Sequence, residues 1–422
     1  MDEKVGGEAQ VCRLCGQFES IYIDVFGDEG TRRLLGLKIH SRINILIDET
    51  DPLPKTICVQ CLGKLEFVCD FQEECLRTQR LLRDRYHLPP LPDLEKTKEM
   101  LQKFSGERSG WVLVGDKQWF FPARYVEQGK GFFEFKARSS DTWVVSYPRS
   151  GTTWTQELVW LLSNNLDFET ASKKYLAERF PFLEFSLFNH PEVTEEFVQL
   201  NKADPEKQKL CRKLGMPGYE VLDAMDSPRF IKSHFPFSLL PGIVNVGCKI
   251  IYVARNPKDV AVSWYHLNRA IKTQGYTGTF EEFWHYFEDN LTPWSPYWEH
   301  LKEAWALRHQ PNLLFMFYEE MQQDLNECVH KVSKFLGKNY SNDEISKLCN
   351  YLHINNFKNN PMVNSSELKD CKIISAGSFV RNGQSGTWSE TFNEKLEAIA
   401  DDWILRNLKG SDFVFPTFNN NY

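Results

Sequence analysis

Beyond about residue 110, short strand-like runs alternate with longer stretches in which apolar residues recur every three or four positions. Four of these runs, each ending in a polar or charged residue, cover residues 142–146, 229–234, 249–254 and 313–317. Apolar runs of this kind are typical of strands buried in a parallel sheet, and the longer repeats are typical of covering helices. The pattern therefore predicts an α/β fold with a largely parallel sheet and a ligand crevice at the carboxyl ends of its strands.

The first strand leads into a turn that suits a phosphate ligand. This turn, YPRSGTTW at residues 147–154, precedes a helical pattern with Trp154, Leu158, Leu161 and Leu162 on one face. At such a turn, main-chain N–H groups and the positive end of the helix dipole bind an anion, and two threonine hydroxyls add donors. An ATP-type loop is excluded, because the G-x-x-x-x-G-K-[ST] spacing is absent and no lysine precedes the threonines.

The other three strands also end in residues that can bind an anion or take a proton. Lys232 and His234 end the second strand, Arg255 follows the third, and Tyr318 follows the fourth. Ser263 falls within a helix predicted after Arg255, where asparagine and proline mark the helix start. A histidine at a strand end is more often a structural hydrogen-bonding residue, so the pattern alone leaves its role open.

Six segments resemble the motifs of the cytosolic-type sulfotransferase family, in the order in which that family carries them. The similarity extends from about residue 110 to the end and is greatest to the insect members. It implies the sulfotransferase fold, a P-loop-like parallel sheet flanked by helices, and sulfonate transfer from 3′-phosphoadenosine 5′-phosphosulfate (PAPS) to a hydroxyl group. The segments are YPRSGTTW, RFPFLEF (179–185), FIKSHFP (230–236), YVARNPKDVAVSWYH (252–266), FYEEM (317–321) and FVRNGQSGTW (379–388).

The resemblance also implies which residues bind the donor. The loop at 149–153 would hold the 5′-phosphate, and Arg255 and Ser263 would hold the 3′-phosphate together with the loop at 381–383. Trp154 and Phe357 would stack on the adenine, because flat apolar faces suit a purine. The implied donor-binding residues are Arg149, Ser150, Gly151, Thr152, Thr153, Trp154, Arg255, Ser263, Tyr318, Phe357, Arg381, Asn382 and Gly383.

By the same resemblance, three residues act in the transfer step. His234 would be the general base for the acceptor hydroxyl, Lys232 would stabilise charge on the sulfonate oxygens, and Arg149 would stabilise the leaving phosphate. This step requires no metal. Phe182 and Phe185 predict an apolar pocket for a small phenol or lipophilic alcohol, although aromatic residues at these spacings also suit an ordinary core.

The chain departs from the family pattern at the donor site. Arg149 stands where many members carry lysine, and Asn382 and Ser389 replace lysines of the late loop. Losing one phosphate contact is expected to weaken donor binding by about 1–3 kcal/mol, as for a charge-assisted hydrogen bond. An alternative hypothesis is therefore a catalytically weak or inactive nucleotide-binding scaffold. The dimerisation pattern of the family is not preserved after Trp388, so no dimer of that type is expected.

The amino-terminal part carries a different signal. Two C-x2-C pairs can complete a closed tetrahedral zinc site with four thiolates. The segment 11–87 resembles the zinc-finger-associated domain (ZAD) of insect transcription factors. This resemblance implies a small zinc-stapled α+β domain that mediates protein interaction or dimerisation, with a helix over about residues 62–85. The predicted metal ligands are Cys12, Cys15, Cys58 and Cys61.

Composition narrows the expected partners and location. The chain has 422 residues and a formal charge of −7, so it offers no basic surface for nucleic acid, and direct DNA reading is not supported. No signal sequence and no bilayer-spanning run are evident, and eleven cysteines suit a reducing compartment. We therefore expect a cytoplasmic protein, with a nuclear location as the alternative that the ZAD implies. Its expected partners are a small hydroxyl acceptor and a protein, or a second copy, bound through the ZAD.

These signals predict two domains joined by a linker. The ZAD would span residues 11–87, a proline-stiffened linker residues 88–109, and the sulfotransferase domain residues 110–422. Residues 186–226, which are acidic and mixed in character, are predicted to form a helical insertion or lid over the acceptor site. A third hypothesis is a chimaera of two neighbouring genes, which an uninterrupted transcript across residues 87–110 would exclude.

Overall fold

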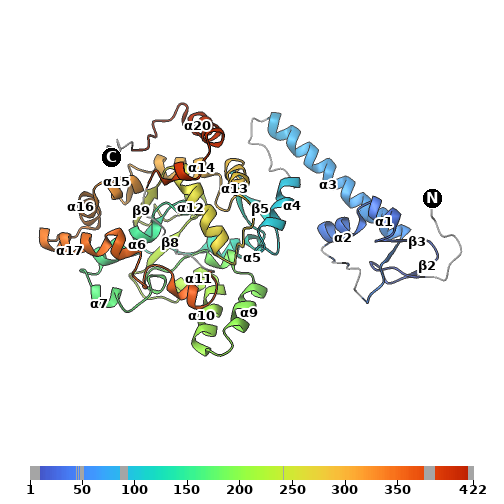
Figure 1. Ribbon diagram of the computed structural model, residues 1–422, viewed down its shortest axis with the longest axis horizontal. Helices are drawn as coiled ribbons and strands as arrows, with labels where there is room; N and C mark the ends of the chain where they lie inside the picture. The colour runs from blue at the N-terminus through green and yellow to red at the C-terminus, as the bar shows by residue number, and fades with distance from the viewer. Residues whose placement is uncertain are drawn as a thin grey trace. The chain divides into compact units, whose positions relative to one another are not determined.

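The computed structural model of the chain describes residues 10–43, 45, 47, 52–85, 94–240, 242–374 and 385–416. These residues form two compact units, one within Met1–Leu91 and one within Pro92–Tyr422 (Figure 1). Three residues predicted to bind the donor, Arg381, Asn382 and Gly383, lie outside the described residues. Among the described residues, no helix is both long enough and apolar enough to span a membrane.

The smaller unit is built from short strands and helices around the two cysteine pairs. Its elements are β1 (Gln10–Val11), β2 (Phe18–Glu19), β3 (Tyr22–Asp24), α1 (Asp28–Arg32), α2 (Leu35–Ile43), β4 (Thr56–Cys58) and α3 (Val59–Arg85). The turn between β1 and β2 carries Cys12 and Cys15, while Cys58 ends β4 and Cys61 lies in the first turn of α3. Both strand pairs are antiparallel, which confirms a small α+β domain.

The core of the smaller unit is small and includes two of the cysteines. Leu35 and Ile39 of α2 cluster with Ile57 of β4 and with Cys12 and Cys58, all of them buried. A domain of this size buries a modest fraction of its surface, so it usually needs a metal, a disulfide or a partner to be stable. The structure therefore places the cysteines where a metal would staple the core.

A four-stranded parallel sheet lies at the centre of the larger unit, in the order β10-β9-β7-β8. Its strands are β7 (Thr142–Val145), β8 (Phe230–Ser233), β9 (Lys249–Ala254) and β10 (Leu313–Phe317). Val144 lies opposite both Lys232 and Ile251, so the carboxyl ends of the strands meet along one edge. This arrangement confirms the predicted α/β fold with a parallel sheet.

Both faces of this sheet are buried, as the apolar runs predicted. Trp143 and Val145 belong to one apolar cluster, whereas Val144 between them belongs to another. Because successive side chains of a strand point to opposite faces, an unbroken apolar run requires cover on both sides. Figure 1 shows β8 and β9 surrounded by helices.

Different helices supply the two apolar clusters. Residues of α6 (Thr152–Ser163), α16 (Leu325–Leu336) and α17 (Asn342–Leu352) form one cluster. Residues of α12 (Pro257–Ala270), α13 (Phe280–Glu288), α14 (Tyr297–Ala306) and α20 (Glu394–Leu408) contribute to the other. Further elements of this unit are β5 (Trp111–Val114), β6 (Trp119–Pro122), α5 (Tyr125–Glu134), α7 (Phe168–Ala171), α8 (Leu176–Arg179), η1 (Phe185–Phe188), η2 (Phe237–Leu239), α15 (Tyr318–Gln323), α18 (Ile354–Phe357), α19 (Ser366–Asp370) and η3 (Thr387–Glu390).

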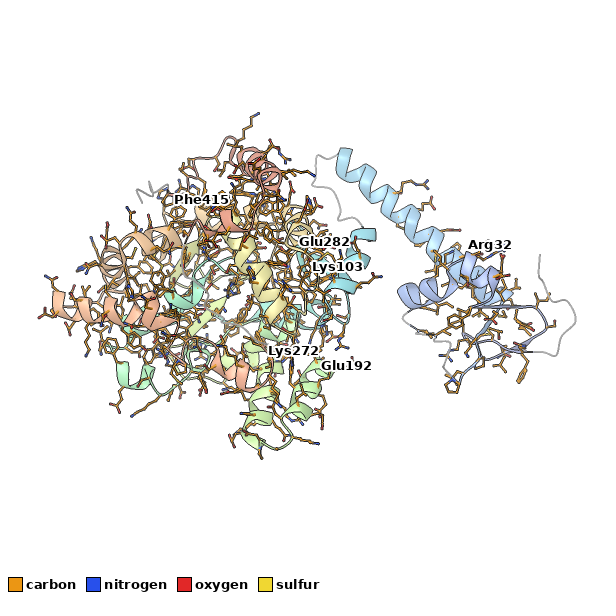
Figure 2. All side chains as sticks on the ribbon, in the orientation of Figure 1. Arg32, Lys103, Glu192, Lys272, Glu282 and Phe415 are labelled. Carbon is orange, nitrogen blue, oxygen red and sulfur yellow. The ribbon has the colours of Figure 1, made fainter. Side chains whose placement is uncertain are left out.

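The segment before β5 differs from the predicted linker over residues 88–109. It contains the helix α4 (Leu94–Lys103), and Met100 and Phe104 are fully buried in the core of the larger unit. Lys103 also forms an ion pair with Glu282 of α13, which Figure 2 shows beside it. The apolar pair at i,i+4 spacing docks this helix, so these residues belong to the larger unit.

The predicted insertion at residues 186–226 is helical. It contains α9 (Pro191–Leu200), α10 (Pro205–Gly215) and α11 (Gly218–Asp223). Proline begins the first two helices, and the side chain of Asp204 caps α10 by accepting a hydrogen bond from the main-chain N–H of Lys207 at 3.1 Å. Helices α9 and α10 lie side by side (Figure 1), and an Arg212–Glu195 ion pair of 3.0 Å joins them.

Candidate functional site

A cavity of about 450 Å³ lies at the carboxyl edge of the parallel sheet. Residues that follow each of the four strands line it, with Arg149 after β7, His234 after β8, Arg255 after β9 and Tyr318 after β10. The ends of parallel strands share one edge, so residues far apart in sequence meet there. The predicted ligand crevice and the cavity therefore coincide.

The turn after β7 is tight and precedes the N-terminus of a long helix. Gly151 has φ +97°, and a Cβ atom at this position would lie 2.4 Å from Cδ2 of Tyr318, so only glycine fits. The Oγ1 of Thr152, the first residue of α6, lies 2.7 Å from the Oγ of Ser146. Gly151 and Thr152 line the cavity. The positive end of the α6 dipole therefore faces the cavity and suits an anion.

Two arginines add fixed positive charge beside this turn. The Nε of Arg149 donates a hydrogen bond to the Oγ of Ser263 at 2.9 Å, and Nη1 of Arg255 donates to the carbonyl oxygen of Arg149 at 3.1 Å. The guanidinium carbon of Arg255 lies 4.3 Å from the ring centroid of Tyr318. These contacts hold both guanidinium groups at the cavity wall, where they can bind phosphate oxygens.

Aromatic side chains form another part of the same wall. Trp154 is held by a 2.9 Å hydrogen bond from its Nε1 to the carbonyl oxygen of Leu352, and its ring meets Tyr318 edge-on at 5.9 Å. Phe357 is buried and also lines the cavity. Flat rings next to anion-binding groups are suited to a nucleotide base.

The ring of His234 is oriented by the chain so that one nitrogen remains available. Its Nδ1 lies 2.7 Å from the carbonyl oxygen of Ser146. Because a carbonyl can only accept, Nδ1 carries the hydrogen and Nε2 keeps its lone pair. Burial holds the pKa of His234 well below its usual range, and the positive charge of Lys232 lowers it further. The imidazole is therefore neutral at neutral pH and can accept a proton.

Lys232 lies beside this histidine in an unusual environment for a cation. Burial lowers the pKa of Lys232 to about 8, the neighbouring Glu184 opposes this shift, and Arg149 adds to it. Its Nζ lies 4.2 Å from the ring centroid of Phe182, which also meets the His234 ring edge-on at 5.1 Å. A lysine with this pKa remains charged at neutral pH and can stabilise negative charge in the cavity.

The far end of the cavity is apolar. Phe182 and Phe185 line it, with their ring centroids 6.0 Å apart, and Trp294 lies 6.3 Å from Phe182. The helical insertion contributes further lining through Leu210 and Leu214 of α10. This part of the cavity can enclose a small apolar molecule whose polar group faces His234.

Most of the predicted active-site residues meet in this one cavity. Within the described part of the chain, Ser150 is the one predicted residue that does not line it, and its buried Oγ has no hydrogen-bond partner there. Sequence reasoning missed Glu184 and Trp294, which flank His234. An acidic residue within the otherwise apolar stretch of RFPFLEF was a signal for Glu184, whereas Trp294 had none.

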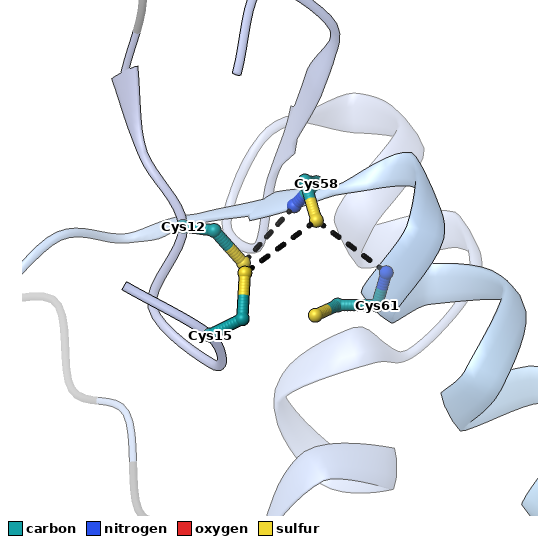
Figure 3. Close-up of side chains that lie close together, drawn as sticks. All are labelled: Cys12, Cys15, Cys58 and Cys61. Carbon is teal, nitrogen blue, oxygen red and sulfur yellow. Dashed lines mark hydrogen bonds between the residues drawn. The ribbon is translucent and has the colours of Figure 1, made fainter. Parts of the chain in front are cut away.

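The four cysteines of the smaller unit form a second candidate site, shown in Figure 3. Their sulfur atoms all lie within 4.8 Å of one another, and those of Cys15 and Cys58 are 3.9 Å apart. Tetrahedral zinc with Zn–S bonds of about 2.3 Å requires sulfur atoms about 3.8 Å apart. The cluster therefore fits a structural zinc ion.

Main-chain N–H groups support this cluster. The N–H of Cys58 donates to the Sγ of Cys12 at 3.3 Å, and the N–H of Cys61 donates to the Sγ of Cys58 at 3.4 Å. Burial raises the pKa of the Cys58 and Cys61 thiols. Burial also raises the pKa of the Cys12 thiol, but main-chain hydrogen bonds from Cys58, Cys15 and Leu14 outweigh this and bring it to about 7. A thiol with such a pKa readily supplies the thiolate that binds a metal.

Comparisons with known proteins match both units. The family model of the sulfotransferase domain matches residues 139–412, and that of the zinc-finger associated domain (zf-AD) matches residues 11–85. Luciferin sulfotransferase of Photinus pyralis is 35% identical over 326 residues, which cover 75% of this chain and 84% of that protein. Sulfotransferase 1E1 of Bos taurus is 33% identical over 296 residues, which cover 70% of this chain and 92% of that protein.

Two solved structures are similar to the larger unit. Retinol dehydratase in complex with androsterone and the inactive cofactor PAP has a TM-score of 0.72 and 35% identity, covering 78% of this chain and 97% of that one. Retinol dehydratase with retinol and PAP has a TM-score of 0.71 and 36% identity, covering 77% and 97%.

Proposed function

We propose that this chain, which belongs to the sulfotransferase family, transfers a sulfonate group from PAPS to the hydroxyl group of a small lipophilic alcohol or phenol. One observation carries this proposal. A single cavity holds an anion-binding turn at Arg149, a neutral histidine, a lysine beside it, and an apolar end. Two solved structures of one relative, retinol dehydratase, contain PAP and share the fold.

The donor supplies an activated sulfonate, and this chain would bind it at the arginine-rich end of the cavity. Residues 149–153 would hold the 5′-phosphate at the N-terminus of α6. Arg255 and Ser263 would hold the 3′-phosphate through charge-assisted and hydroxyl hydrogen bonds. Trp154 and Phe357 would contact the adenine, and Tyr318 would lie beside it.

The transfer step then uses groups that already line the cavity. The Nε2 of His234 takes the proton of the acceptor hydroxyl as its oxygen bonds to sulfur. The bond from sulfur to the phosphate oxygen breaks, and the electron pair stays on the phosphate. Lys232 offers positive charge to the sulfonate oxygens and Arg149 to the leaving phosphate, so charge that develops in the transition state is stabilised.

The substitution of arginine for lysine at position 149 is compatible with this role. Arg149 lines the cavity, and its hydrogen bond to Ser263 holds the guanidinium in place. Arginine supplies a permanent charge and a bidentate fork, although it gives up no proton near neutral pH. No observation on the described residues favours the inactive scaffold over an active enzyme.

The amino-terminal domain would add a structural and partner-binding function. Cys12, Cys15, Cys58 and Cys61 would hold one zinc ion as thiolates. As a ZAD, the domain would bind a protein partner or a second copy of the chain. Sulfonate transfer would then take place in the cytoplasm, or in the nucleus if the ZAD partner is nuclear.

Binding of adenosine 3′,5′-bisphosphate (PAP) tests the donor site without knowledge of the acceptor. Calorimetry on the full-length protein should show PAP binding. Arg255→Ala should weaken this binding by roughly 10- to 100-fold, because it removes a charge-assisted hydrogen bond. Arg406→Ala, which changes an arginine of α20 with 62% of its side chain exposed, should bind as the wild type does. Transfer from labelled PAPS to naphthol then tests the reaction. A folded protein that binds no PAP would refute the proposal.

A further inference from the structure

Glu184 is a fully buried acidic residue with no role in the proposed step. Its two carboxylate oxygens accept three hydrogen bonds from two separate segments of the chain. Oε2 accepts from the Oγ of Ser233 at 2.9 Å, and Oε1 accepts from the main-chain N–H of His234 at 2.5 Å. Oε1 also accepts from the indole Nε1 of Trp294 at 3.2 Å. The carboxyl group therefore links the end of β8 to the loop before α14.

The residues just before Glu184 hold the end of β8 from the same side. The main-chain N–H of Lys232 donates to the carbonyl oxygen of Pro181 at 2.9 Å, and the N–H of Leu183 donates to the carbonyl oxygen of Lys232 at 2.9 Å. Phe182 pairs with Lys232 in a parallel bridge. The segment 181–184 thus fixes three successive residues of the Lys-Ser-His sequence.

Side-chain packing continues this link into the cavity. The ring of Phe182 contacts both the Nζ of Lys232 and the ring of His234. The ring of Trp294 meets the His234 ring edge-on, with centroids 5.3 Å apart. Glu184 is absent from the residues that line the cavity, whereas Lys232, His234 and Trp294 all line it. Its effect on chemistry must therefore pass through these neighbours.

We propose that Glu184 is a positioning residue for sulfonate transfer. Its carboxyl group holds the Lys232, Ser233 and His234 tripeptide and the indole of Trp294 in one arrangement, so that the lysine and the histidine address the same point of the cavity. This inference rests on the proposed sulfotransferase activity. Effective catalysis depends on such placement, because an error of about 1 Å costs roughly 100-fold in rate.

A carboxyl group suits this position better than the alternatives. Burial raises the pKa of Glu184 to about 8, while hydrogen bonds from His234 and Ser233 and the charge of Lys232 act in the opposite direction. Glutamine would keep one oxygen for the N–H groups of His234 and Trp294, and its amide could donate to Ser233. Alanine would leave all of these buried donors without a partner, which is costly.

The test compares Glu184→Ala and Glu184→Gln in the full-length protein, with PAP binding and steady-state transfer to naphthol as readouts. We expect PAP affinity within about twofold of wild type in both variants, because none of the partners of Glu184 belongs to the proposed phosphate site. The kcat should fall roughly 100-fold in Glu184→Ala. The kcat of Glu184→Gln should be at least about tenfold higher than that of Glu184→Ala.

Glu107→Ala is the matched control. Glu107 is also a buried carboxylate that accepts three hydrogen bonds, from the N–H and Oγ of Ser109 and the N–H of Gly110 at 2.8–3.1 Å, and it does not line the cavity. This variant should lose thermal stability and keep the wild-type kcat. A loss of kcat in Glu107→Ala equal to that in Glu184→Ala would mean that any buried carboxylate matters, and would overturn the proposal.

A second variant keeps the test decisive if Glu184→Ala does not fold. Ser233→Ala removes one donor to Glu184 from a side chain that does not line the cavity, and should lower kcat several-fold at unchanged PAP affinity. Wild-type kcat in Ser233→Ala, or equal impairment in Glu184→Ala and Glu184→Gln, would overturn the proposal. If the wild-type protein transfers sulfonate to no acceptor, the proposed function itself fails. If the wild type is active and the variants give either of the results above, only the role of Glu184 fails.

Discussion

The two units of this chain reach a stable fold by different means. The smaller unit clusters a few aliphatic side chains around Cys12 and Cys58 and leaves Phe67 and Phe71 of α3 exposed. The larger unit buries extended apolar clusters on both faces of its sheet and encloses large side chains such as Trp143. One unit brings four thiols together in and beside its small core, whereas the other removes a large apolar area from water.

This difference explains where each unit keeps its reactive groups. In the smaller unit, the four clustered cysteines are the candidate metal ligands, so metal binding and stability would be coupled. In the larger unit, His234 and Lys232 line a cavity, and neither belongs to the apolar clusters that form the core. Shifted pKa values are therefore tolerated there. A change that unfolds or inactivates one unit should therefore leave the other unit intact.

The largest expected effect is the loss of the metal. Cys58→Ser should release zinc and unfold the smaller unit, because structural zinc contributes on the order of 10 kcal/mol of folding free energy. Hydrogen exchange over residues 10–43 and 52–85 would report the loss of protection, and elemental analysis the zinc. Cys75→Ser, an exposed cysteine of α3, serves as the control. PAP binding that disappears together with the zinc would contradict the independence of the two units.

The reciprocal change affects the core of the larger unit. Trp143→Ala empties a fully buried position in β7 and should lower the free energy of unfolding by about 3–5 kcal/mol. Denaturant titration would measure this loss, and Leu405→Ala at a residue that is 69% exposed should change little. Zinc should stay bound in Trp143→Ala. Release of zinc at the same denaturant concentration as unfolding of the larger unit would show one cooperative unit instead.

A smaller effect separates backbone strain from damage to the site. Gly151→Ala and Gly337→Ala both place a side chain at positive φ, at +97° and +71°, and this backbone strain alone should cost each variant about 1–2 kcal/mol of stability. At position 151 the new Cβ would also lie 2.4 Å from Tyr318, whereas position 337 has open space. Gly151→Ala should therefore lose PAP affinity as well. Equal PAP affinity in the two variants would argue against a nucleotide at this turn.

The smallest effect is a pH dependence confined to the larger unit. Burial lowers the pKa of Lys232 to about 8, so kcat should fall as pH rises through 8 and the lysine loses its charge, approaching tenfold per pH unit. Glu184, Arg149 and Glu367 act on this lysine, and Glu184, whose pKa is also raised to about 8, gains its negative charge over the same pH range. Lys232→Arg does not titrate in this range and should flatten the alkaline limb. An unchanged limb in Lys232→Arg would assign it to another group.

Much of the candidate active site could be predicted because its residues follow strand ends. An apolar run and the residue after it are adjacent in sequence, and parallel pairing brings all such ends to one edge, as for His234 and Arg255. The cysteine pairs were readable for the same reason, since each C-x2-C pair is local. Glu184 was not assigned a role, because its partners Ser233 and Trp294 lie far from it in sequence.

The residue pattern was sufficient for the fold class, the two cysteine pairs and the position of the turn after the first buried strand, because periodicity and spacing are local properties of a chain. Long-range packing was needed to place α4 in the larger unit, through Met100 and Phe104. The same is true of the tautomer of His234, which the carbonyl of Ser146 sets, and of the pKa of Lys232, which burial shifts. Burial and hydrogen-bond partners depend on which distant segments meet, and sequence spacing does not contain that information.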